Sequence, residues 1–496
     1  MAFSALGLVG VLHHEPWRDE VEIWLVARDS ESVGALLRNM GTQGHPLLWY
    51  AVSFALTRLT HDPLAMQLTN LAIGTAAAGV FFRFAPFGLV VRLLFVFGYY
   101  ALFEFTVIAR SYALGLLLLF AFCARASRRE GRIDAVGAVL LALLANTTLF
   151  GTMAVAALVA VEAVEALASR RRGRPVPLAP LVLAGAGAAI GLAHVLVQSL
   201  AIGPDHTGAY RPTYDFAWLL SGLAALALGA LPLPDLATEN VWNSNAMLAL
   251  PEPWYLVAPA LLGFALLVAA VVALRDRPRW LAVFGLGLAP MLAIFLFVWF
   301  GWQRHHGQPF LWFVACAWLA GGLRRDAGAP RAAEPTLAAL LALQTLACGL
   351  LLAEDFSRPF SSARAAARWL EEPARAHALL AGTRDYAVEP IAAWSRRPIF
   401  YLDQDRFGTF MDWGHGRREV EDEEIASRAI ALVLRERRRV LLVLNRAPRE
   451  LELGEALALR SDVRARYVAR FVGAIVDDEN YHVFEIAPPA RLSPGR

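Results

Sequence analysis

Two adjacent carboxylates, Asp19 and Glu20, stand beside Trp17 just after a short apolar run at residues 1–12. A carboxylate held at a membrane surface can accept the proton of an attacking hydroxyl. The same segment also suits the start of a helix, because Asp19 is a good N-cap and Glu22 follows three residues later. The residues therefore indicate either a catalytic base or a helix cap, and one side chain can serve as both.

His45 precedes Pro46 in the run Gly44-His45-Pro46-Leu47-Leu48-Trp49-Tyr50. Proline suits the first position of a helix and pushes the preceding residue into an extended conformation. The structural interpretation is a helix start with aromatic residues at the membrane interface. In the functional interpretation, His45 faces the same cavity as Asp19.

Arg110 and Arg304 lie at the ends of apolar runs, where ionisable groups are costly and usually face a cavity or a partner. A guanidinium group is well suited to binding a phosphate. The alternatives are an ion pair of Arg110 with Glu104 and snorkelling of either arginine to the interface. Pairs of histidines at 13–14 and 305–306 make a metal site conceivable, but no ligand spacing favours one.

The composition indicates a polytopic membrane protein. Of 496 residues, 57% are hydrophobic and 18% are charged, whereas a soluble domain carries roughly 25% charged residues. The net charge of +3 gives little footprint for nucleic acid. All 46 basic residues are arginine, which excludes lysine nucleophiles, Schiff bases and P-loop chemistry. The three cysteines lie in apolar runs and form no disulfide framework or metal motif.

These residues must be positioned by membrane-spanning helices. Apolar runs recur at 46–60, 64–82, 88–104, 107–124, 133–148, 150–168, 178–201, 216–231, 254–274, 280–300, 308–322 and 336–353. Arginine clusters at 83, 125–132, 170–174, 275–279 and 324–331 belong in the cytoplasm by the positive-inside rule. Every one of these clusters falls on the cytoplasmic side if the runs 46–60 and 216–231 do not cross the membrane. We therefore expect about 11 spans, starting with a helix whose upstream end is missing.

The chain then divides into a transmembrane domain at 1–353 and a soluble, extracytoplasmic α/β domain at 354–496. Short apolar runs predict strands at 377–381, 398–402 and 440–444. Residues 419–437 read as a helix, with acids early and arginines late, and 467–486 as a hairpin. No glycine-rich phosphate loop follows the strands. In the outer loops, 20–28 is expected to form an amphipathic helix on the membrane surface, with Val21, Trp24 and Leu25 on its apolar side.

The first ~125 residues resemble the GT-C glycosyltransferases that use polyprenyl phosphates. This superfamily includes the protein O-mannosyltransferases of family 39, the aminoarabinose transferase of lipid A and the lipid A galacturonosyltransferases. Three elements match in order: Trp17-Arg18-Asp19-Glu20, His45-Pro46-Leu47-Leu48-Trp49-Tyr50 and Ala109-Arg110-Ser111-Tyr112-Ala113-Leu114. Leu47 stands where the family usually has a second proline.

The resemblance implies an enzyme of the bacterial inner membrane that moves a sugar from a polyprenyl phosphate to an acceptor hydroxyl on the outer face, with inversion. By this resemblance Asp19 is the base and Glu20 a helper or metal ligand, with Mg²⁺ or Mn²⁺ as a cation that some members use. The leaving phosphate needs cationic stabilisation, for which Arg110 and Arg304 are the candidates, with Tyr112 beside them. The expected sugar or acceptor contacts are His45, Trp17 and His305. The acceptor is a lipid, a glycan or a protein.

Two other functions remain open. A polymerase or ligase that moves whole glycans would use a large outer loop, and residues 202–253 contain Tyr210, Arg211 and Tyr214. A lipid or saccharide flippase would need charges deep within several spans. The apolar runs are nearly free of charge at their centres, and repeated halves are not evident.

Overall fold

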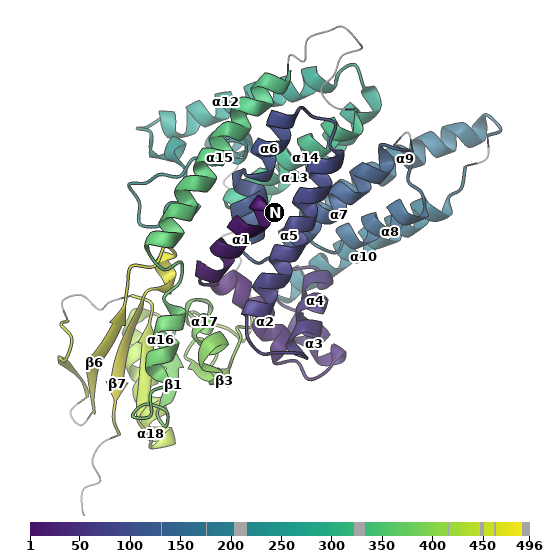
Figure 1. Ribbon diagram of the computed structural model, residues 1–496. Coiled ribbons are helices and arrows are strands. Elements are labelled where there is room, and N and C mark those ends of the chain that lie inside the picture. The colour runs from purple at the N-terminus through teal and green to yellow at the C-terminus, as the bar shows by residue number, and fades with distance from the viewer. Residues whose placement is uncertain are drawn as a thin grey trace, which may run out of the picture.

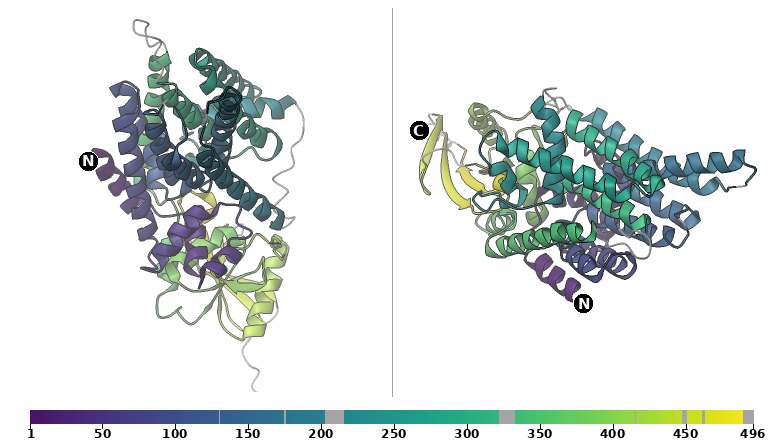
Figure 2. Two further views of the ribbon diagram at one scale, coloured as in Figure 1. Left: turned by 90° about the vertical axis from the view of Figure 1, so that its right-hand side faces the viewer. Right: turned by 90° about the horizontal axis from the view of Figure 1, so that it is seen from above.

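The computed structural model describes residues 1–129, 131–174, 176–202, 216–321, 333–414, 416–446, 451–460 and 463–488. Most of these residues form helices, and a seven-stranded sheet follows at the C-terminal end. Figures 1 and 2 show the sheet gathered at one end of the helical bundle, next to the short helices α2, α3 and α4. The chain is a helical membrane protein with a small C-terminal α/β part, as its composition predicts.

Within the described residues, seven segments are long and apolar enough to cross a membrane. Each carries at least 18 residues, and a span needs about 20. They are α5 (Leu64–Phe84), α6 with η1 (Leu89–Val96 and Tyr99–Val107), α9 (Leu149–Arg171), α10 (Ala179–Ala201), α12 (Trp254–Leu274), α13 (Pro278–Phe297) and α15 (Ala333–Ser357).

Other apolar helices are shorter. They are α1 (Ala2–His13), α4 (Leu47–Thr57), α7 (Ser111–Ala126), α8 (Ala135–Leu144), α11 (Phe216–Ala230) and α14 (Gln303–Leu319). At 1.5 Å per residue, the 11 residues of α4 measure about 16 Å and the 15 of α11 about 22 Å. Both are shorter than the ~30 Å hydrocarbon core. The runs 107–124, 133–148 and 308–322, which are expected to cross, also form short helices of 16, 10 and 17 residues, so length alone does not distinguish the runs that cross.

Contacts between distant segments show which helix ends share a side. Arg279, at the start of α13, donates to Gly131 O at 2.9 Å and pairs with Glu162 near the end of α9. At the other side, Gln198 near the end of α10 exchanges two hydrogen bonds with the backbone of His45, at 2.8 and 3.0 Å. The arginine-rich turns after α7 and before α13 therefore meet at one end of the bundle, and His45 lies at the other.

The sheet has the order β3-β2-β1-β4-β7-β6-β5. Its strands are β1 (Leu379–Gly382), β2 (Ile399–Tyr401), β3 (Arg406–Gly408), β4 (Val440–Leu444), β5 (Ala456–Arg460), β6 (Val463–Phe471) and β7 (Tyr481–Ile486). β1 pairs in parallel with β2 and β4, and the other pairs are antiparallel. The helices of this part are α16 (Ala363–Leu370), α17 (Asp385–Ser395) and α18 (Asp422–Glu436). The predicted strands, the helix at 419–437 and the hairpin at 467–486 are confirmed.

The expected surface helix at 20–28 is present as α2 (Arg18–Arg28), but its predicted environment is wrong. Val21 and Leu25 are fully buried in one core with residues of α16, α17 and the sheet. Trp24 is buried in another core with residues of α3 (Val33–Asn39) and α4. The apolar sides of α2 therefore face protein rather than lipid, because the C-terminal part covers this helix.

Candidate active site

Asp19 lies in the first turn of α2, and it is not the cap of that helix. Trp17 occupies the N-cap position, and its backbone N–H donates to Glu20 Oε2 at 3.2 Å. The expected cap, Asp19 with Glu22, is therefore two residues too late, because Glu20 performs the capping. This frees the carboxylate of Asp19 for other partners.

The Asp19 carboxylate joins two arginines that are far apart in the sequence. Asp19 Oδ2 accepts hydrogen bonds from Arg110 Nη1 at 2.6 Å and from Arg304 Nη2 at 2.7 Å. The side chain of Asp19 is 20% exposed, and those of Arg110 and Arg304 are 5% and 6% exposed. Burial alone raises the pKa of Asp19, but Arg110, Arg304 and Arg18 together hold it below its usual range. The carboxylate is thus ionised and reachable from solvent, whereas both arginines are buried.

Arg110 stands at a break between two helices. The π-helix η1 ends at Val107, the residues after it are extended, and α7 begins at Ser111. A helix end leaves carbonyl groups without partners. The amide of Asn70, on α5, donates to the carbonyls of Phe105, Thr106 and Ile108 at 2.9, 3.1 and 3.2 Å. Asn70 therefore stabilises the break that presents Arg110, a role the sequence analysis missed.

Glu20 is fully buried, and its contacts are with the backbone and His14. Besides Trp17 N, its carboxylate accepts from Ala109 N at 2.5 Å and lies 3.0 Å from His14 Nε2. His14 Nδ1 in turn lies 2.9 Å from Asp355 Oδ2 on α15. Glu20 thus fixes α2 against the residue before Arg110. Its oxygens point to these partners rather than to the arginines of Asp19.

His45 approaches the same group of charges, with Nε2 3.4 Å from Arg110 Nη2. Pro46, the N-cap of α4, follows it as the sequence predicts. Burial and the neighbouring Arg110 lower the pKa of His45 to about 4, so the ring is neutral at physiological pH. We call Asp19, Arg110, Arg304 and His45 the Asp19 cluster. The fold brings together four residues that the sequence analysis singled out.

Aromatic rings surround the Arg304 side of this cluster. The rings of Trp17 and Trp242 meet edge to face at 4.8 Å, and the guanidinium of Arg304 lies 5.4 and 5.8 Å from their centres. Glu104 accepts from Trp242 Nε1 at 2.8 Å and from Tyr99 Oη at 2.7 Å. The ion pair of Glu104 with Arg110, considered from the sequence, is therefore not formed. Arg110 pairs with Asp19 instead.

His305 and Tyr112 are both buried, and each closely follows an arginine of the Asp19 cluster in the sequence. His305 Nδ1 accepts from Trp302 N at 3.0 Å, and its ring lies 4.5 Å from Trp299 and 6.3 Å from Tyr112. The guanidinium of Arg110 lies 5.6 Å from the Tyr112 ring. Tyr112 thus links the charged group to the apolar interior, while His305 is enclosed by aromatic rings.

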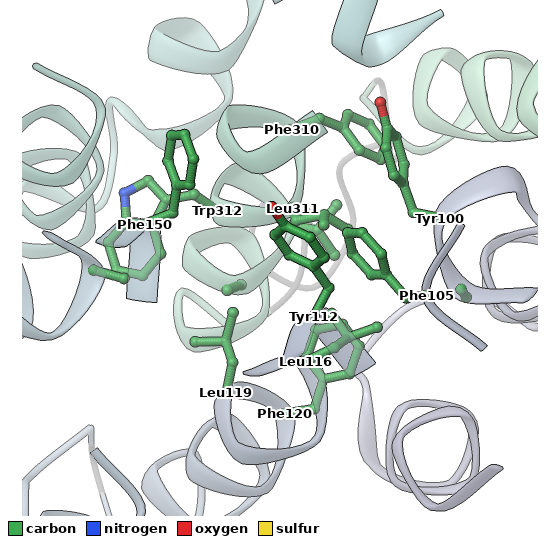
Figure 3. Packing of buried hydrophobic residues seen from close by; sticks show 14 of the residues in the cluster. Tyr100, Phe105, Tyr112, Leu116, Leu119, Phe120, Phe150, Phe310, Leu311 and Trp312 are labelled. Atoms are coloured by element: carbon green, nitrogen blue, oxygen red, sulfur yellow. The ribbon is translucent and has the colours of Figure 1, made fainter. Parts of the chain in front are cut away.

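An apolar cavity begins at Tyr112 and runs between α7, α8, α9, α13 and α14. Figure 3 shows Tyr112 beside Phe105 and Leu311, with the other labelled rings around them. The lining residues are Phe105, Tyr112, Gly115, Leu116, Leu119, Leu144, Thr148, Phe150, Gly151, Ala154, Met291, Gln308, Leu311 and Trp312. The lining of the cavity includes no charged side chain, and its volume of about 40 Å³ marks an apolar path beside Tyr112 rather than a space for a whole hydrocarbon chain.

The described residues include no group of three or more histidine, cysteine, aspartate or glutamate side chains placed to hold a metal ion. Tyr210, Arg211 and Tyr214, which favour the polymerase or ligase alternative, lie outside the described residues, as does the arginine cluster at 324–331.

Comparisons with known proteins give a weak structural likeness and no match in sequence. No known protein-family profile matches the sequence, and no curated protein matches it. The chain is similar in structure to ArnT from Cupriavidus metallidurans, whose crystal structure is bound to undecaprenyl phosphate. The two share 14% identity over 100% of this chain and 99% of that chain, with a TM-score of 0.40. At this level, the likeness carries no argument about fold or function.

Proposed function

We propose that this protein is a membrane glycosyltransferase, which moves a sugar from a polyprenyl phosphate to an acceptor hydroxyl on the outer face of a bacterial plasma membrane. One observation carries the proposal: two buried arginines stand at the head of an apolar cavity. A phosphate joined to a long hydrocarbon chain is complementary to this site: its negative charge would meet the arginines, and its chain would meet the apolar lining. The ordered motifs of the first ~125 residues support the same function.

Two helices support this arrangement of head group and chain. Arg110 precedes α7, and Tyr112, Leu116 and Leu119 of that helix line the cavity. Arg304 lies in the first turn of α14, whose residues Gln308, Leu311 and Trp312 line the cavity further along. Each helix thus carries a guanidinium at its start and an apolar wall below it.

In the proposed reaction, Arg110 and Arg304 move from Asp19 onto the donor phosphate. They stabilise the charge that develops when the bond between the anomeric carbon and the phosphate oxygen breaks. Asp19 accepts the proton of the acceptor hydroxyl, whose oxygen forms the new bond to the same carbon. Base and leaving group on opposite faces of the sugar invert the anomeric carbon. His45, neutral, is the proposed contact to the sugar or acceptor, together with Trp17.

In this proposal Glu20 positions α2, because its carboxylate accepts hydrogen bonds from the backbone N–H groups of Trp17 and Ala109. His305, whose ring lies 6.3 Å from that of Tyr112, remains a proposed contact to the sugar or acceptor. A divalent cation, if one takes part, would come to Asp19. The acceptor is a lipid, glycan or protein that brings a hydroxyl to the 20% exposed carboxylate of Asp19.

The donor site is tested by Arg110→Gln and Arg304→Gln in a transfer assay with purified protein and lipid-linked sugars. Each change should weaken use of the donor by roughly 1–3 kcal/mol, the value of a charge-assisted contact to a phosphate. Arg38→Gln is the matched control, because Arg38 is exposed on α3 at the same end of the molecule. An unchanged donor KM and kcat in both variants would contradict the donor assignment.

Native mass spectrometry of lipids that copurify with the protein would identify the donor. A sugar phosphate on a polyprenol is the expected finding, and it should be depleted in Arg304→Gln. Movement of the lipid across a vesicle bilayer without any transfer of sugar would favour the flippase alternative.

A further inference from the structure

A second cavity, of about 250 Å³, lies apart from the Asp19 cluster. It is bounded by the turn before α5, by α16 and by the end of α17. Its lining is polar and rich in arginine: His61, Asp62, Pro63, Arg364, Ala367, Arg368, Glu371, Ala393, Trp394 and Arg396. We call it the Arg364 pocket. It shares no residue with the Asp19 cluster or with the apolar cavity.

The three arginines of the Arg364 pocket form no ion pair with a described carboxylate. Arg364 instead lies over the ring of Trp394, 5.0 Å from its centre. Arg368 and Arg396 are exposed. The indole Nε1 of Trp394 is a buried donor that has no hydrogen-bond partner among the described residues. Three guanidinium groups around one pocket, none of them in an ion pair with a described residue, favour a ligand with negative charge.

Three carboxylates, Asp62, Glu371 and Glu15, lie near these arginines without forming an ion pair with them among the described residues. Asp62 accepts the backbone N–H of Leu64 at 3.0 Å, at the start of α5. Burial raises the pKa of Glu15, although Arg364 and Arg368 act in the opposite direction. Glu15 therefore lies close enough to interact with both arginines, but it forms no ion pair with either of them among the described residues. Glu371 is exposed.

The pocket lies at the level of the membrane surface. One wall is the turn into α5, a spanning helix that begins at Leu64. The spanning helix α15 ends at Ser357, six residues before α16 begins, and Figure 1 shows α16 just beyond that end. Leu59, close to the turn, is 84% exposed, as expected of a side chain that meets lipid. A ligand in this pocket is therefore within reach of the headgroup layer.

We propose that the Arg364 pocket binds the phosphate of a phospholipid headgroup, and so fastens α16 and α17 to the membrane surface. Arginine binds phosphate through parallel N–H donors, and the ring of Trp394 holds Arg364 beside the pocket. This site goes beyond the proposed glycosyl transfer and does not depend on it.

Native mass spectrometry of the delipidated full-length protein in detergent tests the proposal. The probes are dioctanoyl phosphatidylglycerol, dioctanoylglycerol, which lacks the phosphate, and inorganic phosphate as competitor. The double variant Arg364→Gln/Arg368→Gln should bind the phospholipid at least about tenfold more weakly than the wild type, because two charge-assisted contacts are lost. Dioctanoylglycerol should bind weakly to both proteins.

Two kinds of control separate the outcomes. Arg438→Gln/Arg464→Gln removes the same charge from exposed positions of the C-terminal part and should bind normally. The Arg364→Gln/Arg368→Gln change should cause the same loss in an Arg110→Gln background, which separates the Arg364 pocket from the proposed donor site of the Asp19 cluster. Trp394→Phe leaves only a smaller ring beneath Arg364, so a moderate loss is expected even if the double variant folds poorly.

Equal affinity for the phospholipid in the wild type, the double variant and Trp394→Phe would overturn the proposal. Equal affinity for phosphatidylglycerol and dioctanoylglycerol would overturn it as well. If inorganic phosphate displaces the phospholipid at matched concentration, the site takes phosphate as a free ion, and the lipid assignment is overturned.

Discussion

At the scale of single residues, the state of Asp19 is set by its two arginine partners. Arg110 and Arg304 donate hydrogen bonds to Asp19 Oδ2 at 2.6 and 2.7 Å, and their charges keep the carboxylate ionised. A lowered pKa makes a carboxylate a weaker base. Departure of Arg110 and Arg304 onto a phosphate would restore basicity when the donor is bound. The site is thus arranged so that donor binding activates the proposed base.

Asp19→Asn tests this role. Loss of a general base typically lowers the rate by about 10²–10⁴-fold, so kcat should fall by that factor. The donor KM should not rise, because asparagine competes less than aspartate for the arginines. A role limited to holding Arg110 and Arg304 in place predicts the opposite, a higher donor KM with little change in kcat. A fully active Asp19→Asn enzyme would remove Asp19 from catalysis.

Glu22, one turn after Asp19 on α2, should make the stability depend on pH. Burial raises its pKa, and Asp19 adds to the rise, while Arg110, Trp413 and Arg18 oppose it. Above pH ~4.3 the unfolded chain ionises this residue while the folded protein still holds the proton. The folded state then binds more protons than the unfolded state, so stability falls as pH rises.

Glu22→Gln removes this dependence and preserves an acceptor for Trp413 Nε1, which lies 3.4 Å from Glu22 Oε1. The melting temperature of the variant should exceed that of the wild type at pH 7.5, with a smaller difference at pH 5. Glu31→Gln, at an exposed position, is the control and should change neither value. A wild type that becomes more stable relative to Glu22→Gln as pH rises would contradict this assignment.

At the scale of elements, His14 joins three helices. It follows α1, bonds Glu20 on α2 at 3.0 Å and bonds Asp355 on α15 at 2.9 Å. Burial lowers the pKa of His14, but Asp355 and Glu20 raise it further, to about 10. The imidazolium is therefore the expected form at neutral pH. It holds Glu20 in place, and through Glu20 the helix that carries Asp19.

His14→Gln should lower the free energy of unfolding by about 3 kcal/mol near pH 6.5, because two buried carboxylates lose their cation. The folded pKa lies above the unfolded one, so the stabilisation is complete below ~6.5 and is lost as pH rises toward 10. The difference between variant and wild type should therefore shrink from pH 6.5 to pH 9.5 in thermal melts. His377→Gln, at an exposed position, is the control. A difference that grows with pH would refute the role of His14 as a cation.

At the scale of the whole molecule, the C-terminal part lies on the same side as Asp19. Arg18 N donates to Glu479 Oε1 at 2.7 Å, and Arg18 Nη1 bonds Asp478 Oδ2 at 2.8 Å. The arginine-rich turns that Arg279 joins lie at the opposite end of the helices. By the positive-inside rule we expect those turns in the cytoplasm, and we therefore predict that the sheet and the Asp19 cluster lie outside.

Fusions test this topology. Alkaline phosphatase joined after the C-terminal residue should be active in cells, and a fluorescent protein there should stay dark. Phosphatase inserted at Arg172, between α9 and α10, is the matched control and should be inactive. The reverse pattern at both sites would invert the topology and place the proposed transfer in the cytoplasm.

The sequence by itself determined the class of molecule and the candidates for its site. Hydropathy depends on local composition, so the long apolar runs indicate α5, α9, α10, α12, α13 and α15. Apolar runs and charge asymmetry likewise indicated β1, β2, β4 and α18, because these patterns span few residues. The rare charges at the ends of apolar runs singled out Arg110 and Arg304, since charge near a membrane is costly.

Only the tertiary structure decided how those candidates are used. Asp19, Arg110 and Arg304 meet at one oxygen although they are separated by most of the membrane part, and no local pattern encodes such a contact. For the same reason, the sequence did not predict that α17 covers α2 or that Asn70 stabilises the break before Arg110. Glu20 and Asp19 are neighbours in the sequence and equally acidic. They differ in function because a helix turns successive side chains about 100° apart, which sends one to the backbone before Arg110 and the other to the arginines.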